Sequence, residues 1–260
     1  MFKAYIETFK KYKYLLVNLI TRDFRVKYRR SVLGIVWSML NPMLMVLVLN
    51  AVFSRVFRFQ IDNFALYLIS GQTIFNFFNE STSSAIFSIV EASALIKKVY
   101  IPKYLFPLEK VLFAFVNMLF SLAAVVMLLL IYRVPFSWTM LLFFVPLIGA
   151  LMFSCGFSLI ISCLCVFFRD LKHLYSVLLT AWMYMTPIIY PISIVQDSWI
   201  RYIVYINPLT TYVETFRSVV MYNQLPSAEQ LLIGFGYGVV FLIIGLVVFR
   251  KGQDKFILNV

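Results

Sequence analysis

The sequence predicts an all-α polytopic membrane protein with six transmembrane helices, an N-terminal amphipathic interface helix and an extracellular re-entrant hairpin. Five long stretches carry no Asp, Glu, Lys or Arg, and a sixth is interrupted only by Glu80. These stretches cover 31–54, 65–90, 111–132, 134–168, 174–196 and 230–249. About 20 apolar residues cross the hydrocarbon of a bilayer, so each stretch is long enough to span it. Charged residues make up 13% of the chain, against about 25% in a typical soluble domain.

The placement of the basic residues predicts the orientation. If the N-terminus lies in the cytoplasm and the chain crosses six times, the inside holds nine Lys/Arg before residue 31, four at 91–110, two at 169–172 and three after 249, and the outside holds five. Basic residues concentrate in cytoplasmic loops, so both termini are expected to be cytoplasmic. The formal net charge of +12 is then a topology signal and an attraction to anionic lipids rather than to nucleic acid.

The first element, 1–30, is expected to lie in the membrane interface as an amphipathic helix. Tyr12, Leu15, Leu16 and Leu19 recur at nearly helical spacing, with basic residues on other faces. One interpretation is a basic topology anchor. The other is a cationic collar for an anionic lipid-linked substrate, because the planar fork of Arg donates two parallel hydrogen bonds to phosphate. The collar residues are Arg22, Arg25, Lys27, Arg29 and Arg30.

The second span is the most polar. Gln72, Asn76 and Glu80 follow one another at steps of four, so they lie along one face of a helix. Such a face should look at protein or water rather than lipid. It forms either a wall of a polar conduit or a set of interhelical hydrogen bonds that hold the bundle together. Glu80 has no basic partner within a span, which weakens a proton-relay interpretation.

Prolines mark kinks and ends in the remaining predicted elements. The first span carries Pro42, which kinks a helix, and the fifth ends in Pro187 and Pro191. The apolar segment after it, interrupted by Pro208, fits a re-entrant hairpin, in which Glu214 and Arg217 are three residues apart and can pair. The expected bounds within a single membrane domain, 1–260, are spans at 31–57, 65–90, 108–132, 138–168, 173–191 and 230–250, a cytoplasmic coupling loop at 92–104 and the hairpin at 197–229.

The coupling loop suggests a soluble partner. An apolar patch, Leu95, Ile96, Val99 and Tyr100, lies among basic residues, and Pro102 stops any helix there. A short amphipathic helix of this kind inserts into a groove on a partner protein. An ordinary membrane-surface loop has the same composition.

Catalytic patterns are missing from the sequence. It contains no Gly-rich phosphate loop and no His-Glu-x-x-His, and its eleven acidic residues are scattered. These features argue against an enzyme such as a membrane-embedded transferase. No metal site is expected, since the three cysteines have no His or carboxylate beside them.

Five motifs, in order along the whole chain, resemble type-2 ABC transporter permeases that export polysaccharides. They are RDFRVKYRRSVLGIVW at 22–37 followed by Asn41-Pro42, LIKKVYIP at 95–102, FRDLK at 168–172, TPIIYP at 186–191, and NPLT at 207–210 with Phe216-Arg217. The resemblance implies a homodimer in a bacterial inner (plasma) membrane, with two copies of a nucleotide-binding ATPase subunit docked on its cytoplasmic side. No cofactor is expected on this chain, because ATP and Mg belong to the partner.

The resemblance also implies roles for particular residues. The collar would face the diphosphate of an undecaprenyl-type lipid-linked glycan of the O-antigen, capsule or teichoic-acid type. Residues that would seat on the ATPase are Leu95, Ile96, Lys97, Lys98, Val99, Tyr100, Ile101, Pro102 and Lys103. Residues that would line the pore are Trp37, Gln72, Asn76, Glu80, Tyr175, Trp182 and Tyr184. Residues that would form an outer gate are Pro187, Tyr190, Pro191, Asn207, Pro208, Glu214 and Arg217.

The aromatic content of 18% suits a glycan, because sugar C–H faces pack on aromatic rings. An aromatic belt at the two membrane interfaces is the alternative for these rings. A type-2 ABC exporter of a lipid or drug is the alternative function within transport, and a structural membrane subunit without a conduit is a further one.

Overall fold

A computed structural model describes residues 2–56, 61, 63–99 and 101–256, and every regular element among them is a helix. Four helical segments are long and apolar enough to cross a membrane: Gly34–Phe53, Leu105–Ile131, Trp138–Phe167 and Ala228–Lys255. The protein is therefore an all-α, multi-pass membrane protein. Two of the six predicted spans fall outside this set, each for a reason visible in its helix.

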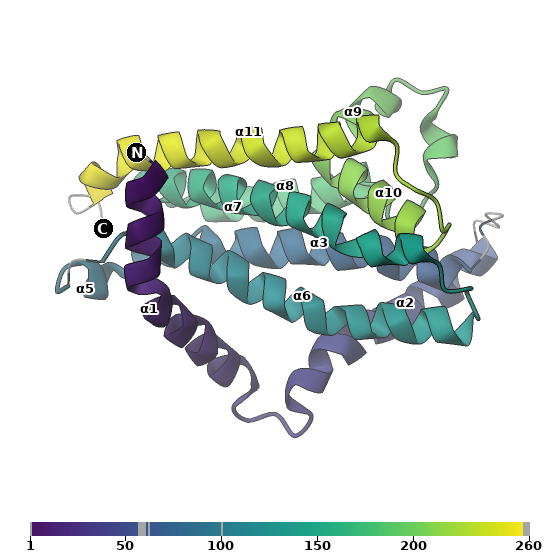
Figure 1. Cartoon of the computed structure of the whole chain (residues 1–260), viewed down its shortest axis with the longest axis horizontal. Helices are drawn as coiled ribbons and strands as arrows, with labels where there is room; N and C mark the ends of the chain where they lie inside the picture. The colour runs from purple at the N-terminus through teal and green to yellow at the C-terminus, as the bar shows by residue number, and fades with distance from the viewer. Residues whose placement is uncertain (1, 57–60, 62, 100, 257–260) are drawn as a thin grey trace.

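Most of the long helices lie side by side along the long axis of the molecule, and one of them, α2 (Trp37–Val56), runs obliquely beside the others (Figure 1). The others are α3 (Phe64–Ala85), α6 (Leu105–Ile131), α7 (Phe144–Phe167), α8 (Leu171–Met185) and α11 (Ala228–Gly252). Short helices gather at the two ends of this bundle. At one end lie α4 (Ser88–Glu91) and α5 (Ser93–Ile96), and at the other lie α9 (Ile200–Ile206) and α10 (Pro208–Val220). The 3-10 turns are η1 (Gly34–Val36), η2 (Trp138–Phe143), η3 (Ile192–Val195) and η4 (Gln253–Lys255).

The first exception is α3, which is long enough to span but more polar than the other long helices. It packs against α2, α6, α7 and α10, and its first turns, from Phe64 to Phe75, are buried. The polar side chains of these turns, Ser70, Gln72 and Thr73, therefore face protein rather than lipid, which is the condition for polar groups inside a membrane.

The second exception is α8, which replaces the span predicted at 173–191. The helix ends at Met185, because Thr186 adopts an extended backbone (ψ 131°) before Pro187. The ring of a proline excludes the helical conformation from the residue that precedes it. Fifteen residues give a helix of about 22 Å, shorter than the ~30 Å hydrocarbon core.

The closest helix pair is α7 with α11. A Cβ added at Gly156 would lie 2.2 Å from the backbone carbonyl of Phe241, and one added at Gly245 would lie 2.3 Å from the carbonyl oxygen of Gly156. Only glycine permits this approach, as at other small-residue contacts between membrane helices. The face of α7 that carries Gly156 is thus a packing surface for α11.

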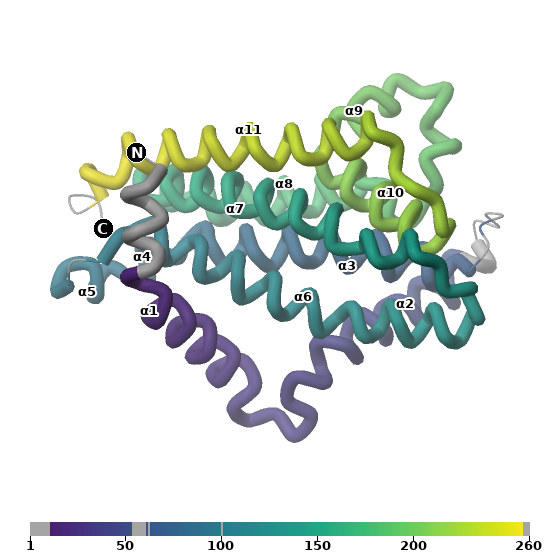
Figure 2. The backbone as a smooth tube through the Cα atoms, viewed as in Figure 1, coloured from purple at the N-terminus to yellow at the C-terminus, as the bar shows by residue number. Residues whose placement is uncertain are grey.

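The interface helix α1 (Phe2–Tyr28) leaves the bundle at an angle (Figure 2). Leu16 is buried in an apolar cluster with Ile101, Phe249 and Phe256, and Leu19, three residues further along, is buried as well. The helix then runs away from this end of the bundle to the turn that leads into α2. Its last residues consequently lie beside the bundle near the start of α2, where they reach the site described next.

Candidate functional site

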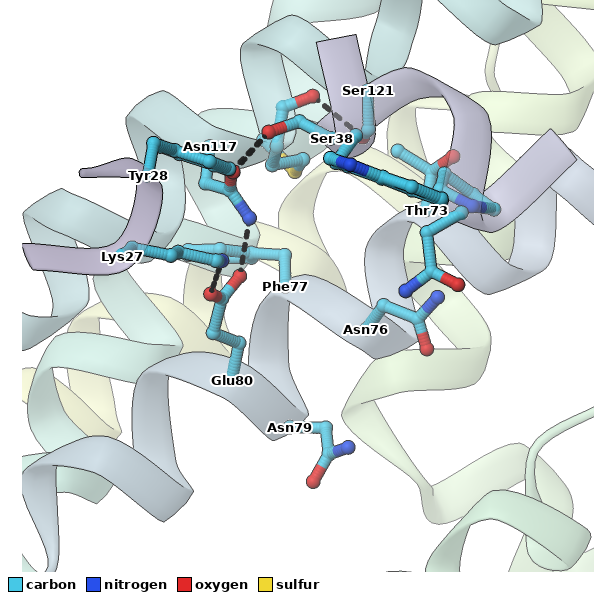
Figure 3. Close-up of a pocket in the computed structure, with 14 residues that line it drawn as sticks. Lys27, Tyr28, Ser38, Thr73, Asn76, Phe77, Asn79, Glu80, Asn117 and Ser121 are labelled. Atoms are coloured by element: carbon cyan, nitrogen blue, oxygen red, sulfur yellow. Dashed lines mark hydrogen bonds and ion pairs between the residues drawn. The ribbon is translucent and has the colours of Figure 1, made fainter. Parts of the chain in front are cut away.

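A polar cavity of about 580 Å³ lies between the end of α1, the start of α2, the second half of α3 and the middle of α6 (Figure 3). Asn117 on α6 is twelve residues beyond Leu105, or about 18 Å along the helix. The cavity is therefore close to the middle of a span. Its lining residues are Lys27, Tyr28, Trp37, Ser38, Asn41, Pro42, Thr73, Asn76, Phe77, Asn79, Glu80, Asn117, Met118 and Ser121.

One network of hydrogen bonds joins the four helices around the cavity. The Nζ of Lys27 lies 2.6 Å from Oε1 of Glu80, and the amide of Asn117 donates to Oε2 of Glu80 at 2.7 Å. The Oδ1 of Asn117 in turn accepts from Tyr28 at 3.0 Å and from Ser38 at 2.7 Å. Asn117 thus uses both ends of its amide, and Glu80 receives its basic partner from the interface helix rather than from another span.

The predicted collar is divided by these contacts. Lys27 pairs with Glu80, and Arg22 forms an ion pair with Asp23 at 2.8 Å. The other three collar residues, Arg25, Arg29 and Arg30, are exposed on the last turns of α1 and just beyond it. Three cations are therefore available for an anion, all near the turn into α2.

Asp23 joins α1 to α6. Its carboxylate accepts a hydrogen bond from Lys110 as well as from Arg22. Burial raises the pKa of this carboxyl, but the hydrogen bonds from Lys110 and Arg22 outweigh the burial and hold its pKa below the ordinary value. The carboxyl is accordingly ionised at neutral pH.

The predicted pore residues fall into two separate places. Trp37, Asn76 and Glu80 line the polar cavity, but Gln72 is buried and does not. Tyr175 and Trp182 line a different, apolar cavity of about 450 Å³ on α8. Tyr184 is 64% exposed. The single chain therefore does not bring these residues together into one channel.

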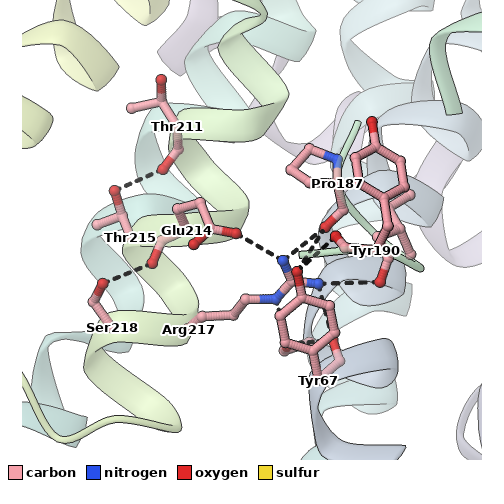
Figure 4. A network of polar contacts seen from close by, with 10 residues as sticks. Tyr67, Pro187, Tyr190, Thr211, Glu214, Thr215, Arg217 and Ser218 are labelled. Carbon is pink, nitrogen blue, oxygen red and sulfur yellow. Dashed lines mark hydrogen bonds and ion pairs between the residues drawn. The ribbon is translucent and has the colours of Figure 1, made fainter. Parts of the chain in front are cut away.

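Three of the predicted gate residues, Pro187, Glu214 and Arg217, meet at the guanidinium of Arg217, which is fully buried (Figure 4). Its Nη1 donates to the carbonyl of Pro187 and lies 2.7 Å from Oε1 of Glu214. The remaining hydrogen bonds of its guanidinium go to Ser70 Oγ and to the carbonyls of Tyr67 and Ile188. We call Arg217, Glu214, Tyr67, Ser70 and the carbonyls of Pro187 and Ile188 the Arg217 cluster. It ties α3, the segment after α8, and α10 together.

Tyr67 and Gly71 shape this cluster. The hydroxyl of Tyr67 donates to the carbonyl of Tyr190 at 2.9 Å, and its ring lies under the guanidinium. A Cβ at Gly71 would lie 2.8 Å from Nη2 of Arg217. Glycine at this position therefore leaves room for the guanidinium against α3.

A second set of hydrogen bonds, centred on Asn207, connects the end of α8 to the start of α10. Asn207 caps α10 by accepting from the backbone N–H of Leu209 at 3.0 Å, and its Oδ1 also accepts from Trp182 at 2.8 Å. The Nδ2 of Asn207 donates to Oγ1 of Thr186 at 2.9 Å. Pro208 follows as the first residue of α10, where its missing N–H is not needed. Pro191 precedes η3 and makes no contact in either network among the described residues.

The coupling loop differs from the predicted helix. Its α-helical part, α5, is a single turn that ends at Ile96, six residues before Pro102. Leu95, Lys97, Lys98 and Val99 are exposed, Ile101 packs into the cluster beneath α1, and Tyr100 lies outside the described residues. Exposed short helices are marginal in water, which explains the early end. Lys103 anchors the loop by donating to the carbonyl of Gln253 at 2.5 Å.

Comparison with known proteins assigns the family. The profile of the ABC-2 type transporter matches residues 14–221. The O-antigen export system permease protein RfbA of Klebsiella pneumoniae is 32% identical over 246 residues, 93% of each chain. The RfbA protein of Myxococcus xanthus is 31% identical over 94% of this chain and 95% of its own. The polysialic acid transport protein KpsM of Escherichia coli is 22% identical over 95% of this chain and 96% of its own.

The chain belongs to the ABC-2 type transporter family. Membership implies an ATP-binding partner subunit and agrees with the expectation that the ABC-2 chain is not itself an enzyme. The family match includes the polar cavity, the coupling loop and the Arg217 cluster, all of which lie within residues 14–221.

Three important residues of this ABC-2 chain escaped the sequence-based predictions. Asn117 had a visible signal, since it is a lone amide in an otherwise apolar span. Ser38 and Tyr67 had none, because their partners lie 79 and 123 residues away in the sequence. Contacts of this range depend on how the helices pack.

Proposed function

We propose that this chain is the permease subunit of an ATP-driven exporter that moves a lipid-linked polysaccharide across a bacterial inner (plasma) membrane. The observation that carries the proposal is the 31–32% identity to the O-antigen export permeases of two organisms over more than nine-tenths of both chains. The glycan is of the O-antigen, capsule or teichoic-acid type, linked to an undecaprenyl-type lipid.

In this proposal the working unit is a homodimer with two ATPase subunits, which bind ATP and Mg. Six segments cross the membrane, with α3 and α8 added to the four long apolar helices, and both termini are cytoplasmic. The polar α3 is compatible with this count because it is enclosed by other helices. The segment from η3 through α10 forms the outer hairpin and gate.

Exposed apolar surface supports the dimer. Only 11% of the span Gly34–Phe53 is buried in the single chain, against 61% of Trp138–Phe167. On α8, Leu174, Val177 and Leu178 are also exposed. These two helices are consequently free to face a second copy and to line a channel between the copies.

The coupling role rests on the exposed apolar residues of the loop. Leu95 is 37% exposed and Val99 is 52% exposed. Both lie at the end of the bundle that its basic residues identify as cytoplasmic in the proposed topology. The groove of a soluble partner would cover them.

Reconstitution tests the proposal. The chain and its ATPase subunit are placed in vesicles loaded with the lipid-linked glycan of the producing cell, and the exposure of glycan on the far leaflet is followed. Transfer should require ATP and both subunits. Transfer by the chain alone, or ATP-driven transfer of unglycosylated lipid at an equal rate, would contradict it.

A further inference from the structure

Two side-chain amides in the polar cavity make no hydrogen bond to the described part of the protein. Asn41 on α2 and Asn76 on α3 both line it and are exposed. Within the described part of the chain neither makes a hydrogen bond, although each amide offers two donors and an oxygen acceptor. Figure 3 shows Asn76 and Asn79 projecting from the same side of α3.

The position of the cavity within the membrane indicates what kind of molecule these amides contact. They line the same cavity as Asn117 and Ser121, which belong to the middle part of α6. Unsatisfied polar groups at this depth are expensive in hydrocarbon, so the cavity should hold polar matter rather than lipid tails.

The charges of the lining argue against an anionic occupant. Among the described residues that line the cavity, only Lys27 and Glu80 are charged, and they pair with each other at 2.6 Å. An added phosphate would have to compete with Glu80 for Lys27. The unpaired cations Arg25, Arg29 and Arg30 do not line the cavity.

The walls fit a sugar. Trp37, 43% exposed, and the rings of Tyr28 and Phe77 contribute aromatic surface. Sugar rings offer C–H faces to such surfaces, and sugar hydroxyls both donate and accept, as amides do. The volume of about 580 Å³ falls within the usual range of ligand pockets, roughly 300–1,000 Å³.

We propose that this cavity binds a neutral sugar residue of the lipid-linked substrate, while the diphosphate stays outside at Arg25, Arg29 and Arg30. The inference rests on the proposed function and refines it, because it divides recognition of one molecule between two places. The sugar is selected by amides and rings, and the lipid diphosphate by guanidinium groups.

A binding experiment separates the two places. The full chain with its ATPase subunit, in lipid nanodiscs, is titrated with two probes, the lipid-linked glycan extracted from the producing cell and undecaprenyl diphosphate without sugar. The wild-type complex should bind the glycolipid more tightly. Asn41→Ala and Asn76→Ala should each weaken glycolipid binding about fivefold, the effect of roughly one lost hydrogen bond, and leave the sugar-free probe unchanged.

Two further variants complete the design. Asn18→Ala, the same substitution at an exposed position on α1 outside the cavity lining, should change neither affinity. Neutralising Arg25, Arg29 and Arg30 should weaken both probes by the same factor. Because Asn41 and Asn76 are exposed and unpaired, their replacement should leave folding intact, which size-exclusion chromatography verifies.

The outcomes distinguish this inference from the proposed function. If the glycolipid binds but both asparagine variants match the wild type, the cavity is filled by water and the inference fails while the function stands. If the asparagine variants weaken both probes equally, the cavity holds the diphosphate and the inference fails. If neither probe binds the wild-type complex, the proposed function fails as well.

Discussion

The guanidinium of Arg217 stacks on the ring of Tyr67, with Cζ 3.4 Å from the ring centroid. The two residues are 150 positions apart in the sequence and belong to different helices. The stack brings a buried cation against an aromatic face, an arrangement that gains strength when water is excluded. It places α10 directly on α3, and the Pro187 carbonyl completes the connection to the end of α8. Arg217 is therefore the residue on which the geometry of the predicted outer gate depends most.

Arg217→Met should lower the stability of the protein by about 3 kcal/mol, because it leaves Glu214 and several buried carbonyls without their donor. Thermal unfolding in detergent, followed by circular dichroism, measures the change. Arg201→Met is the control, since Arg201 is exposed and bonds to Gln196 and its neighbour Tyr202. Equal melting temperatures for the two variants would show that the cluster contributes little.

Gly156→Ala should disrupt the contact between α7 and α11, because the new methyl group would overlap the Phe241 carbonyl at 2.2 Å. We expect a destabilisation of about 1–3 kcal/mol, typical of overpacking in a close-packed interior. Gly236→Ala on α11 meets nothing within 4 Å and should stabilise the helix by roughly 0.5–1 kcal/mol. Melting temperatures that move in the same direction in both variants would contradict this assignment.

Lys27→Met should release the end of α1 with little effect on global stability. The Lys27–Glu80 pair is partly exposed, with 38% and 28% of the two side chains accessible, and exposed pairs contribute about 0–1 kcal/mol. Limited trypsin digestion at Arg29 and Arg30 should accelerate, while the melting temperature stays nearly constant. Lys11→Met, on the first half of α1, is the control and should leave the digestion rate at the wild-type value.

Replacement of Leu95 and Val99 by Asp should separate ATP hydrolysis from export. Both side chains are exposed, so the change should leave the fold intact while it places charge in the proposed apolar contact with the ATPase. The measurement compares ATPase turnover and glycan transfer in the reconstituted complex, with Leu225→Asp, at a 71% exposed position outside this loop, as the control. If the variant transferred as much glycan per ATP hydrolysed as the wild type does, the loop would have no coupling role.

Asp23 predicts an acid-dependent contribution to stability. Its pKa in the folded protein is lowered, so the stabilisation is fully present above the ordinary pKa of an aspartate, about 3.9, and is lost as the pH falls through the lowered value. The difference in unfolding free energy between the wild type and Asp23→Asn should be constant between about pH 5 and about pH 8 and shrink below about pH 4. A difference that instead grows on acidification would contradict the direction of the shift.

Local patterns in the sequence predicted local features. Pro187 ends α8, Asn207-Pro208 starts α10, and Glu214 pairs with Arg217 one turn later. Each of these depends on neighbouring residues and on simple helix chemistry, so no knowledge of packing was needed.

Long-range relationships could not be predicted in this way. Gln72, Asn76 and Glu80 were assigned to one face, but each step of four residues rotates the helix by about 40°. Over two steps the rotation reaches about 80°, so the side chain of Gln72 points into the protein while that of Glu80 points into the cavity. The partners Lys27, Asn117 and Tyr67 come from other helices, and hydropathy does not specify which helices become neighbours.

The glycine contact between α7 and α11 also limits how this protein can change shape. With the backbone of Phe241 against Gly156 and that of Gly156 against Gly245, neither helix can slide or rotate past the other without a steric clash. The two helices should therefore behave as a stationary frame. Rearrangements that admit and release a cargo then have to occur among the loosely held helices, α1, α2 and α8, whose exposed surfaces have room to change neighbours.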